Sequence, residues 1–171
     1  MSELNEYEKA LEKYSKTLEG KPMPLHSWDF FSHYFDDLKS AISDISQLKG
    51  LSKDKKWLAD WDFSEQLQQE KVIVVTDIDL KIVFASQNII KMTGYSFEEV
   101  VGKSPKIFQG KETSKKDLQH IREAIDSKIP FEKTIINYKK NGEAYPCHIK
   151  AFPVFNTKNE VVNFIAFEKA A

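Results

Sequence analysis

The sequence predicts an α+β protein: one five-stranded antiparallel sheet with short helices on one face, preceded by an N-terminal helical extension. Helical spacing of apolar residues dominates up to about residue 70, and segments typical of strands and of helices alternate beyond it. The predicted strands are joined as hairpins except across one helical block, and hairpins make a sheet antiparallel. Two of these strands, 72–76 and 161–167, are apolar on both faces, so we expect them at the centre of the sheet with cover on both sides.

The N-terminal part is predicted to hold three helical stretches. Apolar residues at spacings of three and four indicate helices over 4–18 and 28–48, ended by Gly20 and Gly50 respectively. A shorter helical stretch follows, and its apolar residues are Trp57, Leu58 and Trp61. Two or three heptads are too few for a free-standing coiled coil, so these stripes should pack on the sheet or on a second copy of the chain. The extension is therefore expected either to cover the second face of the sheet or to mediate dimerisation.

Beyond residue 70 the predicted elements follow one another closely. The β-branched run 72–76 and the strand 82–86 form a first hairpin. Two more hairpins complete the sheet: Asn141-Gly142, the strongest short hairpin signal, turns the first of them, and a further turn leads into the last strand, 161–169. The helices between these hairpins are predicted over 88–94, 96–102 and 113–127.

Local signals define the ends of the first two of these helices. Asn88 or Ser86 is expected to cap the helix over 88–94, and Gly94 to terminate it. Ser96, followed three residues later by Glu99, is a capping box for the next helix. Both helices are therefore expected to be brief.

Composition bounds the function classes. The 171 residues suit one domain plus an extension, which we divide into an N-terminal helical extension over 1–62 and a domain over 63–171. The net charge is −1 with both signs interspersed, which gives no reason to expect nucleic acid or an anionic membrane as a partner. Cys147 is the only cysteine, so an intrachain disulfide and a cysteine-based zinc site are excluded. The N-terminus lacks a signal peptide and no run approaches about 18 apolar residues, so we expect a soluble cytoplasmic protein.

Two longer runs carry a family resemblance. They are VTDIDLKIVFASQNIIKMTGYSFEEVVGKSPKIFQG and YKKNGEAYPCHIKAFPVFNTKNEVVNFIAFEK, and over about residues 65–170 they resemble a PAS domain. The resemblance implies a sensory or interaction module whose sheet and helical block usually enclose a ligand pocket, and whose terminal helices carry the signal. The LOV flavin photoreceptors are the most similar subgroup, because they carry a loop like KSPKIFQG.

The reactive residue of that loop is missing. In LOV domains the loop holds a cysteine whose thiolate forms a photo-adduct with the flavin ring. The matching residue here is Pro105, which has no thiol and no side-chain proton to give, so this chemistry is absent. Cys147 does not replace it, because it matches a strand position where LOV domains carry an amide that hydrogen-bonds the pyrimidine edge of the flavin.

The other flavin-contact positions are partly kept. Gln109, Arg122 and Asn137 match the LOV pattern, whereas Ser104 stands where asparagine is usual. Lysine replaces arginine at position 106, and glutamate stands at 168 where a glutamine normally switches its hydrogen bonds to the flavin. The cofactor-binding residues that the resemblance implies are Thr76, Lys106, Gln109, Arg122, Asn137, Cys147 and Glu168.

Glu168 sets a condition on flavin binding. An ionised carboxylate only accepts hydrogen bonds, and it would lie near ring carbonyls that also only accept. A protonated carboxyl could donate, but this needs surroundings that raise its pKa.

Several of these residues also have a purely structural explanation. Gln109 can close a turn, Arg122 can pair with Asp126 one turn on, and Asn137 can serve the neighbouring hairpin. The content of the pocket therefore stays open between FMN, another small ligand and the domain's own side chains.

Haem and metal sites are disfavoured. Haem needs an axial histidine near the start of the long helix, and His120 lies in its middle. Cys147 and His148 cannot share a metal ion, because neighbours in a strand point to opposite faces.

Three functions stay open. The leading one is a non-enzymatic PAS sensory module that binds a small ligand or a signalling partner protein and forms a homodimer through its N-terminal helices. The second is a flavin-binding, LOV-like photosensor or redox sensor without the covalent adduct. The third, an enzyme that uses Glu168 as a base, rests only on the position of that residue at the pocket edge, and the sequence carries no local signature of a catalytic triad, phosphate loop or histidine kinase.

Overall fold

The computed structural model describes residues 26–171, with side chains from residue 35 onward. Residues 37–171 form one compact unit that contains the whole sheet. The helices and strands, in chain order, are α2 (His26–Asp54), α3 (Phe63–Gln68), β1 (Val72–Thr76), β2 (Ile82–Ala85), α4 (Ile89–Thr93), α5 (Phe97–Val100), the 3₁₀ helix η1 (Pro105–Phe108), α6 (Lys115–Asp126), β3 (Phe131–Tyr138), β4 (Ala144–Phe155) and β5 (Val161–Ala170).

The five strands form a single sheet in the order β2-β1-β5-β4-β3, and every neighbouring pair is antiparallel. The two strands that are apolar on both faces, β1 and β5, lie inside the sheet, as predicted. All five residues of β1 are buried. Because side chains alternate along a strand, Val72 and Val74 lie on one face and Ile73 and Val75 on the other. We call the face of Val72 and Val74 the inner face and the opposite one the outer face.

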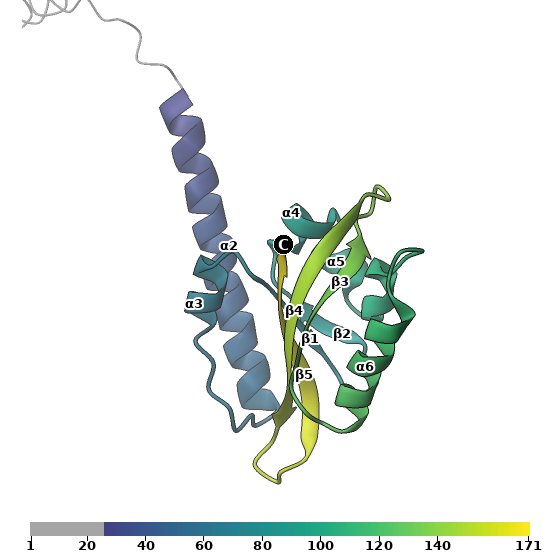
Figure 1. Cartoon of the computed structure of the whole chain (residues 1–171). Coiled ribbons are helices and arrows are strands. Elements are labelled where there is room, and N and C mark those ends of the chain that lie inside the picture. The colour runs from purple at the N-terminus through teal and green to yellow at the C-terminus, as the bar shows by residue number, and fades with distance from the viewer. Residues whose placement is uncertain (1–25) are drawn as a thin grey trace, which may run out of the picture. The chain divides into compact units, whose positions relative to one another are not determined.

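Short helices cover the inner face, which confirms the predicted fold class. Val72 and Val74 pack in one buried cluster with Ile89 of α4, Val100 of α5 and Phe108 of η1. The β3–β4 half of the same face packs against Leu118 and Ile121 of α6, among other residues. Figure 1 shows these helices on the opposite side of the sheet from α2 and α3.

The outer face is covered by α2 of the same chain. Leu48 of α2 is fully buried and packs with Ile73 and Val75 of β1 and with Ile165 of β5. Figure 1 shows the C-terminal half of α2, together with α3, lying along this face. Of the two roles expected for the helical extension, covering the sheet is therefore confirmed for the part of α2 that carries Ile45, Leu48 and Leu51.

The predicted end of this helix at Gly50 is wrong. α2 continues through Gly50 to Asp54, and Lys56 then takes a left-handed backbone conformation with φ 54°. Glycine inside a helix costs only about 1 kcal/mol relative to alanine. Packing of Leu51 against the outer-face core offsets that cost.

The helical stretch predicted around Trp57, Leu58 and Trp61 is also wrong. Trp57 forms an isolated β-bridge with Asn156, and its Nε1 donates to Asn163 Oδ1 at 3.0 Å. The helix in this region begins later, where Asp62 accepts a hydrogen bond from the backbone N–H of Glu65 at 3.0 Å. The spacing of four residues between Trp57 and Trp61 is typical of a helix. Here the segment that carries them is not helical, and both rings pack in the outer-face core.

Two of the predicted helix ends are confirmed and one predicted cap is wrong. Gly94 terminates α4 in a left-handed conformation with φ 75°, and Ser96 with Glu99 forms the predicted capping box of α5. Neither Asn88 nor Ser86 caps α4 through its side chain, because the Ser86 hydroxyl donates to Asn88 Oδ1 at 2.6 Å instead. The helix expected over 4–18 lies outside the described residues.

The predicted hairpin over Asn141-Gly142 is confirmed, since Gly142 has φ 88° and donates its N–H to Lys139 O at 2.9 Å. No helix among the residues that the structure describes is long and apolar enough to cross a membrane.

The packing of α2 on its own sheet predicts that Leu48→Ala lowers the free energy of unfolding by about 2–5 kcal/mol, because it opens a cavity in the outer-face core. Lys49→Ala, at an exposed position of the same helix, should change it by less than about 0.5 kcal/mol. Urea titration measures both. An unfolding midpoint that rises with protein concentration would show that a second copy, and not this α2, supplies the cover.

Candidate functional site

Four polar side chains gather on the inner face where β3, β4 and β5 meet. Strand alternation places Asn137, Tyr145, Cys147 and Glu168 on this face, and all four are buried. Asn137 pairs with Tyr145 across β3 and β4, and Ile149, two residues beyond Cys147, pairs with Glu168 across β4 and β5. We call these four residues the inner polar cluster.

The inner polar cluster has unused hydrogen-bonding capacity. Asn137 Oδ1 and Tyr145 Oη are fully buried and have no hydrogen bond of good geometry in the described part of the chain, although the Asn137 amide and the Cys147 thiol lie near enough to Tyr145 to influence its pKa. A buried polar atom without a partner costs about 1–3 kcal/mol, so such atoms ordinarily bind another protein group, an ordered water or a ligand. An acceptor and a hydroxyl side by side suit a small polar ligand.

The carboxyl of Glu168 meets the condition that flavin binding imposes. The residue is only 6% exposed, and its Oε2 accepts a weak hydrogen bond from Cys147 Sγ at 3.8 Å. Burial raises the pKa of Glu168 from 4.5 to about 7, which the thiol only partly offsets. A large share of Glu168 is therefore protonated near neutral pH and can donate a hydrogen bond, as an amide does.

The thiol and the phenol of the cluster are both neutral. Burial, and next the charge of Glu168, raises the pKa of Cys147 well above its ordinary value. Burial, followed by the charges of Cys147 and Glu168, does the same for the pKa of Tyr145. A nucleophilic cysteine needs a lowered pKa and partial exposure, so this site holds no activated thiol.

The loop at 103–110 closes over the sheet as a structural turn. Ser104 precedes η1 and its hydroxyl accepts from the N–H of Lys106, while Pro105 takes the first helical position, where a missing N–H costs nothing. Phe108 is buried against Tyr95, with ring centroids 5.8 Å apart. Gln109 ends η1 by donating its N–H to Lys106 O at 3.0 Å, and its side chain is half-buried.

The loop is also fastened to β3 beside the cluster. A Cβ on Gly110 would overlap the ring of Tyr138, and the Thr113 hydroxyl donates to Ile136 O at 2.6 Å. Because Ile136 and Tyr138 flank Asn137 in β3, these contacts hold the end of the loop next to the amide of the cluster.

The seven predicted site residues fall into three groups. Asn137, Cys147 and Glu168 lie together in the inner polar cluster, and Gln109 lies on the loop described above. Thr76 is buried, and its Oγ1 has no hydrogen-bond partner among the residues that the structure describes. It pairs with Phe164, four residues before Glu168 in β5, so it sits toward the other end of the inner face. The remaining two, Lys106 and Arg122, are exposed.

Arg122 makes the contact that its structural explanation expects. Its Nε lies 3.9 Å from Asp126 Oδ2, and both side chains are more than two-thirds exposed, so the pair contributes little to stability. An exposed cation is free to meet a charged group of a ligand at the surface.

Tyr145 is the member of the cluster that sequence reasoning missed. The signal was available, because Tyr145 and Cys147 are two residues apart in one strand and therefore share a face. His148, between Cys147 and the end of β4, points the other way and lies 3.2 Å from Glu132. No group of three or more possible metal ligands occurs among the described residues.

Comparison with known proteins assigns the family. A family profile described as PAS domain matches residues 70–169, which is more than half of the chain. The chain belongs to the PAS domain family. The matched region of this PAS domain begins two residues before β1 and stops one residue before the end of β5, so it includes the whole inner polar cluster.

Curated relatives of this PAS domain are LOV proteins and light-activated kinases. Protein TWIN LOV 1 of Arabidopsis thaliana is 41% identical over 88 residues, which are 51% of this chain and 22% of that protein. A blue-light-activated histidine kinase of Brucella canis is 36% identical over 88 residues, or 52% of this chain and 18% of that protein. The chain thus spans about a fifth of the length of these relatives.

Solved structures place it among LOV domains as well. The dark structure of the blue-light photoreceptor Aureochrome1 LOV aligns with a TM-score of 0.60 and 26% identity, over 66% of this chain and 85% of that one. The LOV domain of the Erythrobacter litoralis EL346 blue-light activated histidine kinase shares the fold, with a TM-score of 0.56 and 24% identity over 58% of this chain and 94% of that one. The chain is therefore a PAS domain that is similar to LOV domains, and Pro105 stands where the LOV resemblance expects the photo-adduct cysteine.

The buried carboxyl predicts a pH dependence. Between about pH 4.5 and about pH 7 the folded protein keeps a proton on Glu168 that the unfolded chain has lost, so its stability falls as the pH rises through this window. The contribution is roughly 3 kcal/mol between the two limits, and Glu168→Gln should remove it. Urea unfolding of both proteins at about pH 5 and about pH 8 measures the difference.

Two features make this comparison specific. Asp44, whose pKa burial raises to about 6, gives a slope of the same sign, but it is present in both proteins and cancels. Glu112→Gln, at an exposed position, should keep the full pH dependence. If Glu168→Gln keeps it too, the carboxyl is not protonated in the folded state.

Proposed function

We propose that this PAS domain is the non-enzymatic sensory module of a signalling protein and that it binds a small polar ligand at the inner polar cluster. The observation that carries the proposal is the pair of buried atoms, Asn137 Oδ1 and Tyr145 Oη, which have no hydrogen-bond partner among the described residues and lie beside a carboxyl that burial keeps about half protonated near neutral pH. A ligand with a donor for Asn137 and an acceptor for Glu168 satisfies both needs at once.

A flavin held without a covalent bond is the ligand that these residues favour most specifically. Its pyrimidine edge offers an N–H between two carbonyl oxygens, which complements an amide beside a protonated carboxyl. Asn137 and Gln109 match LOV positions, and a protonated Glu168 can donate where LOV domains carry glutamine. Lys106 and Arg122 stand exposed where the LOV pattern has cations, which suits a phosphate at the surface. Without a thiol at position 105, any response to light would run through flavin reduction or rearranged hydrogen bonds.

We further propose that the module forms a homodimer through α2. Leu38 and Ile42 are 44% and 59% exposed and lie four residues apart, on a different part of the helix surface from the buried Leu48. A second copy of the same stripe would cover these side chains, as expected of an extension that carries a signal to a partner. The kinase activity named for the Brucella canis protein remains a property of that protein.

Flavin binding predicts that the purified protein is yellow, or becomes so with added FMN, with absorbance near roughly 450 nm. Asn137→Ala should weaken FMN binding about tenfold or more, because it removes a buried hydrogen bond, and Gln119→Ala, an amide on the exposed side of α6, should not. Fluorescence titration with FMN measures both.

Native mass spectrometry separates the general proposal from the flavin. A different co-purified small molecule that Asn137→Ala releases would retire FMN and support the sensory site. Protein that stays ligand-free and does not take up FMN would count against both.

The homodimer predicts that Leu38→Glu combined with Ile42→Glu produces a monomer, since buried glutamates would repel across the interface. Lys39→Glu changes charge on the same helix at another exposed position and should leave a dimer intact. Sedimentation velocity reports the mass. A wild-type monomer at every concentration would remove the homodimer.

A further inference from the structure

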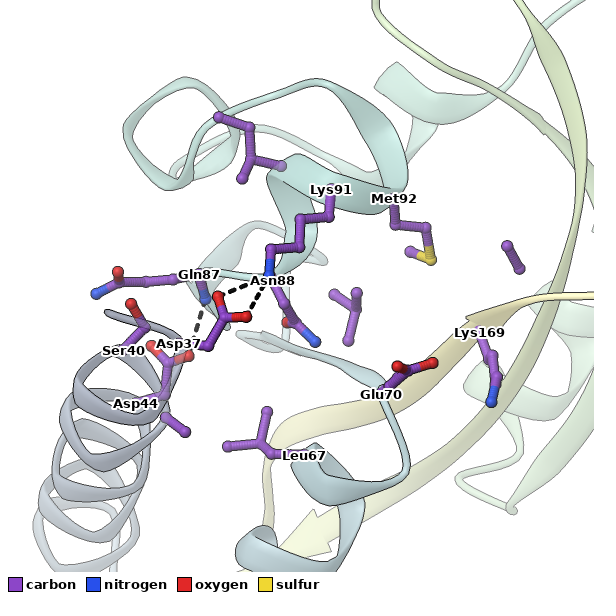
Figure 2. A pocket seen from close by; sticks show the side chains of 14 residues that line it. Asp37, Ser40, Asp44, Leu67, Glu70, Gln87, Asn88, Lys91, Met92 and Lys169 are labelled. Atoms are coloured by element: carbon purple, nitrogen blue, oxygen red, sulfur yellow. Dashed lines mark hydrogen bonds and ion pairs between the residues drawn. The ribbon is translucent and has the colours of Figure 1, made fainter. Parts of the chain in front are cut away.

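A recess lies between α2 and α4, at the end of the sheet where β1 begins and β5 ends. It is a groove of about 610 Å³. One wall is α2, from Asp37 to Asp44, and the other wall is the start of α4. The start of β1 and the end of β5 form its floor. Figure 2 shows these elements around the groove. The volume falls in the range of small-molecule sites.

Asp44 is the polar anchor of this groove. It is only 2% exposed although it is an acid, and its Oδ2 accepts a hydrogen bond from the backbone N–H of Gln87 at 2.9 Å. Its other oxygen, Oδ1, is buried and has no partner in the part of the chain that the structure describes. Burial raises the pKa of Asp44 to about 6, so the group is mostly ionised near neutral pH and Oδ1 then lacks a donor.

The two lysines that line the groove are occupied elsewhere. Lys91 Nζ lies 2.6 Å and 2.7 Å from the two carboxylate oxygens of Asp37, and Figure 2 shows it reaching that residue. Lys169 Nζ donates to the backbone oxygen of Gln69 at 3.3 Å. Glu70 adds another acid to the lining, and with all side chains ionised its three acids outnumber its two lysines by one, which leaves the groove attractive to a cation.

The rest of the lining is apolar. Ala41 on α2, Leu67 on α3 and Met92 on α4 border the same space. An ammonium or guanidinium head with a hydrocarbon body therefore matches the lining better than a bare ion. A metal ion would need several oxygen ligands, and no group of three possible ligands occurs among the described residues.

We propose that this groove binds a small organic ammonium ion, with the ammonium donating to Asp44 Oδ1 and the apolar body lying against Ala41, Leu67 and Met92. The site is separate from the inner polar cluster and does not depend on flavin. Because Asp44 belongs to α2 and Gln87 precedes α4, the ligand would bridge the helix and the domain on which it packs. Binding would therefore hold α2 against the domain.

The test uses the ¹⁵N-labelled full chain and n-hexylammonium as the probe. Its addition should shift the Gln87 amide resonance progressively. Asp44→Asn should weaken binding about tenfold or more, because a charge-assisted hydrogen bond is lost while the acceptor for Gln87 is kept. Asp54→Asn, an exposed acid at the end of the same helix, should bind as wild type does. Equal affinities for the two variants would overturn the proposal.

Two further measurements separate charge from shape. 1-Hexanol has the same body without the charge and should bind about tenfold more weakly or worse, and equal binding of both probes would overturn the ammonium site. Ala41→Leu narrows the groove without touching a charge and should weaken n-hexylammonium binding. If Ala41→Leu folds normally and binds as wild type does, the probe is not in this groove.

The pH profile identifies the acid. Wild-type affinity for n-hexylammonium should rise as the pH rises through about 6 and then level off, because only the carboxylate form of Asp44 attracts the ammonium. Asp37, Glu70, Lys91 and Lys169 also line the groove and are unchanged in Asp44→Asn, so any dependence due to them persists in that variant. A profile that is the same in both proteins would assign the titration to those groups and overturn the role of Asp44.

Discussion

The pair of strands β1 and β5, apolar on both faces, is the constraint on which the rest of the structure depends. Burying apolar surface contributes about 25 cal/mol per Å², so neither face of this pair can be left to water. The short helices cover the inner face, and α2 with its following segment covers the outer one. The part of α2 that carries Ile45, Leu48 and Leu51 is therefore packed into the core of the domain, and any signal that moves it must first offset that burial.

Burial away from water also determines the protonation states in the inner polar cluster. Far from water, a carboxyl prefers to keep its proton, a thiol and a phenol stay neutral, and an unpartnered amide oxygen is costly. Glutamate at position 168 therefore differs less from the LOV glutamine in hydrogen bonding than the sequence suggests, because protonated Glu168 offers both a donor and an acceptor. Pro105 is the sharper departure, since no environment can give proline a nucleophile.

The sequence was sufficient to predict features that follow from the spacing of apolar residues, and less so for features that depend on contacts between distant segments. Strand alternation and the Asn141-Gly142 turn predicted the sheet and its two central strands, while the family resemblance predicted that Cys147 and Glu168 lie at one pocket. It failed where a tertiary contact overrides a local signal, as at Gly50, which lies inside a helix. Burial of Asp44 could not be predicted either, because an acid on a helix is ordinarily solvated and nothing local reveals that Gln87 lies opposite.

Glu168 and Asp44 lie near the same end of β1 and have the same electrostatic need. Glu168 pairs with Val72 in the sheet, and Val72 also lines the groove that holds Asp44. Each acid is buried with its pKa raised, so each is stabilised either by a proton or by a donor that a ligand supplies. Loss of the proton from either acid, or binding of a cation to its carboxylate, changes the net charge near the strand that they share, and Coulomb interactions are stronger where water is excluded than in bulk water. Because Asp44 sits on α2, a change of charge at this end of β1 acts electrostatically on a residue of the helix.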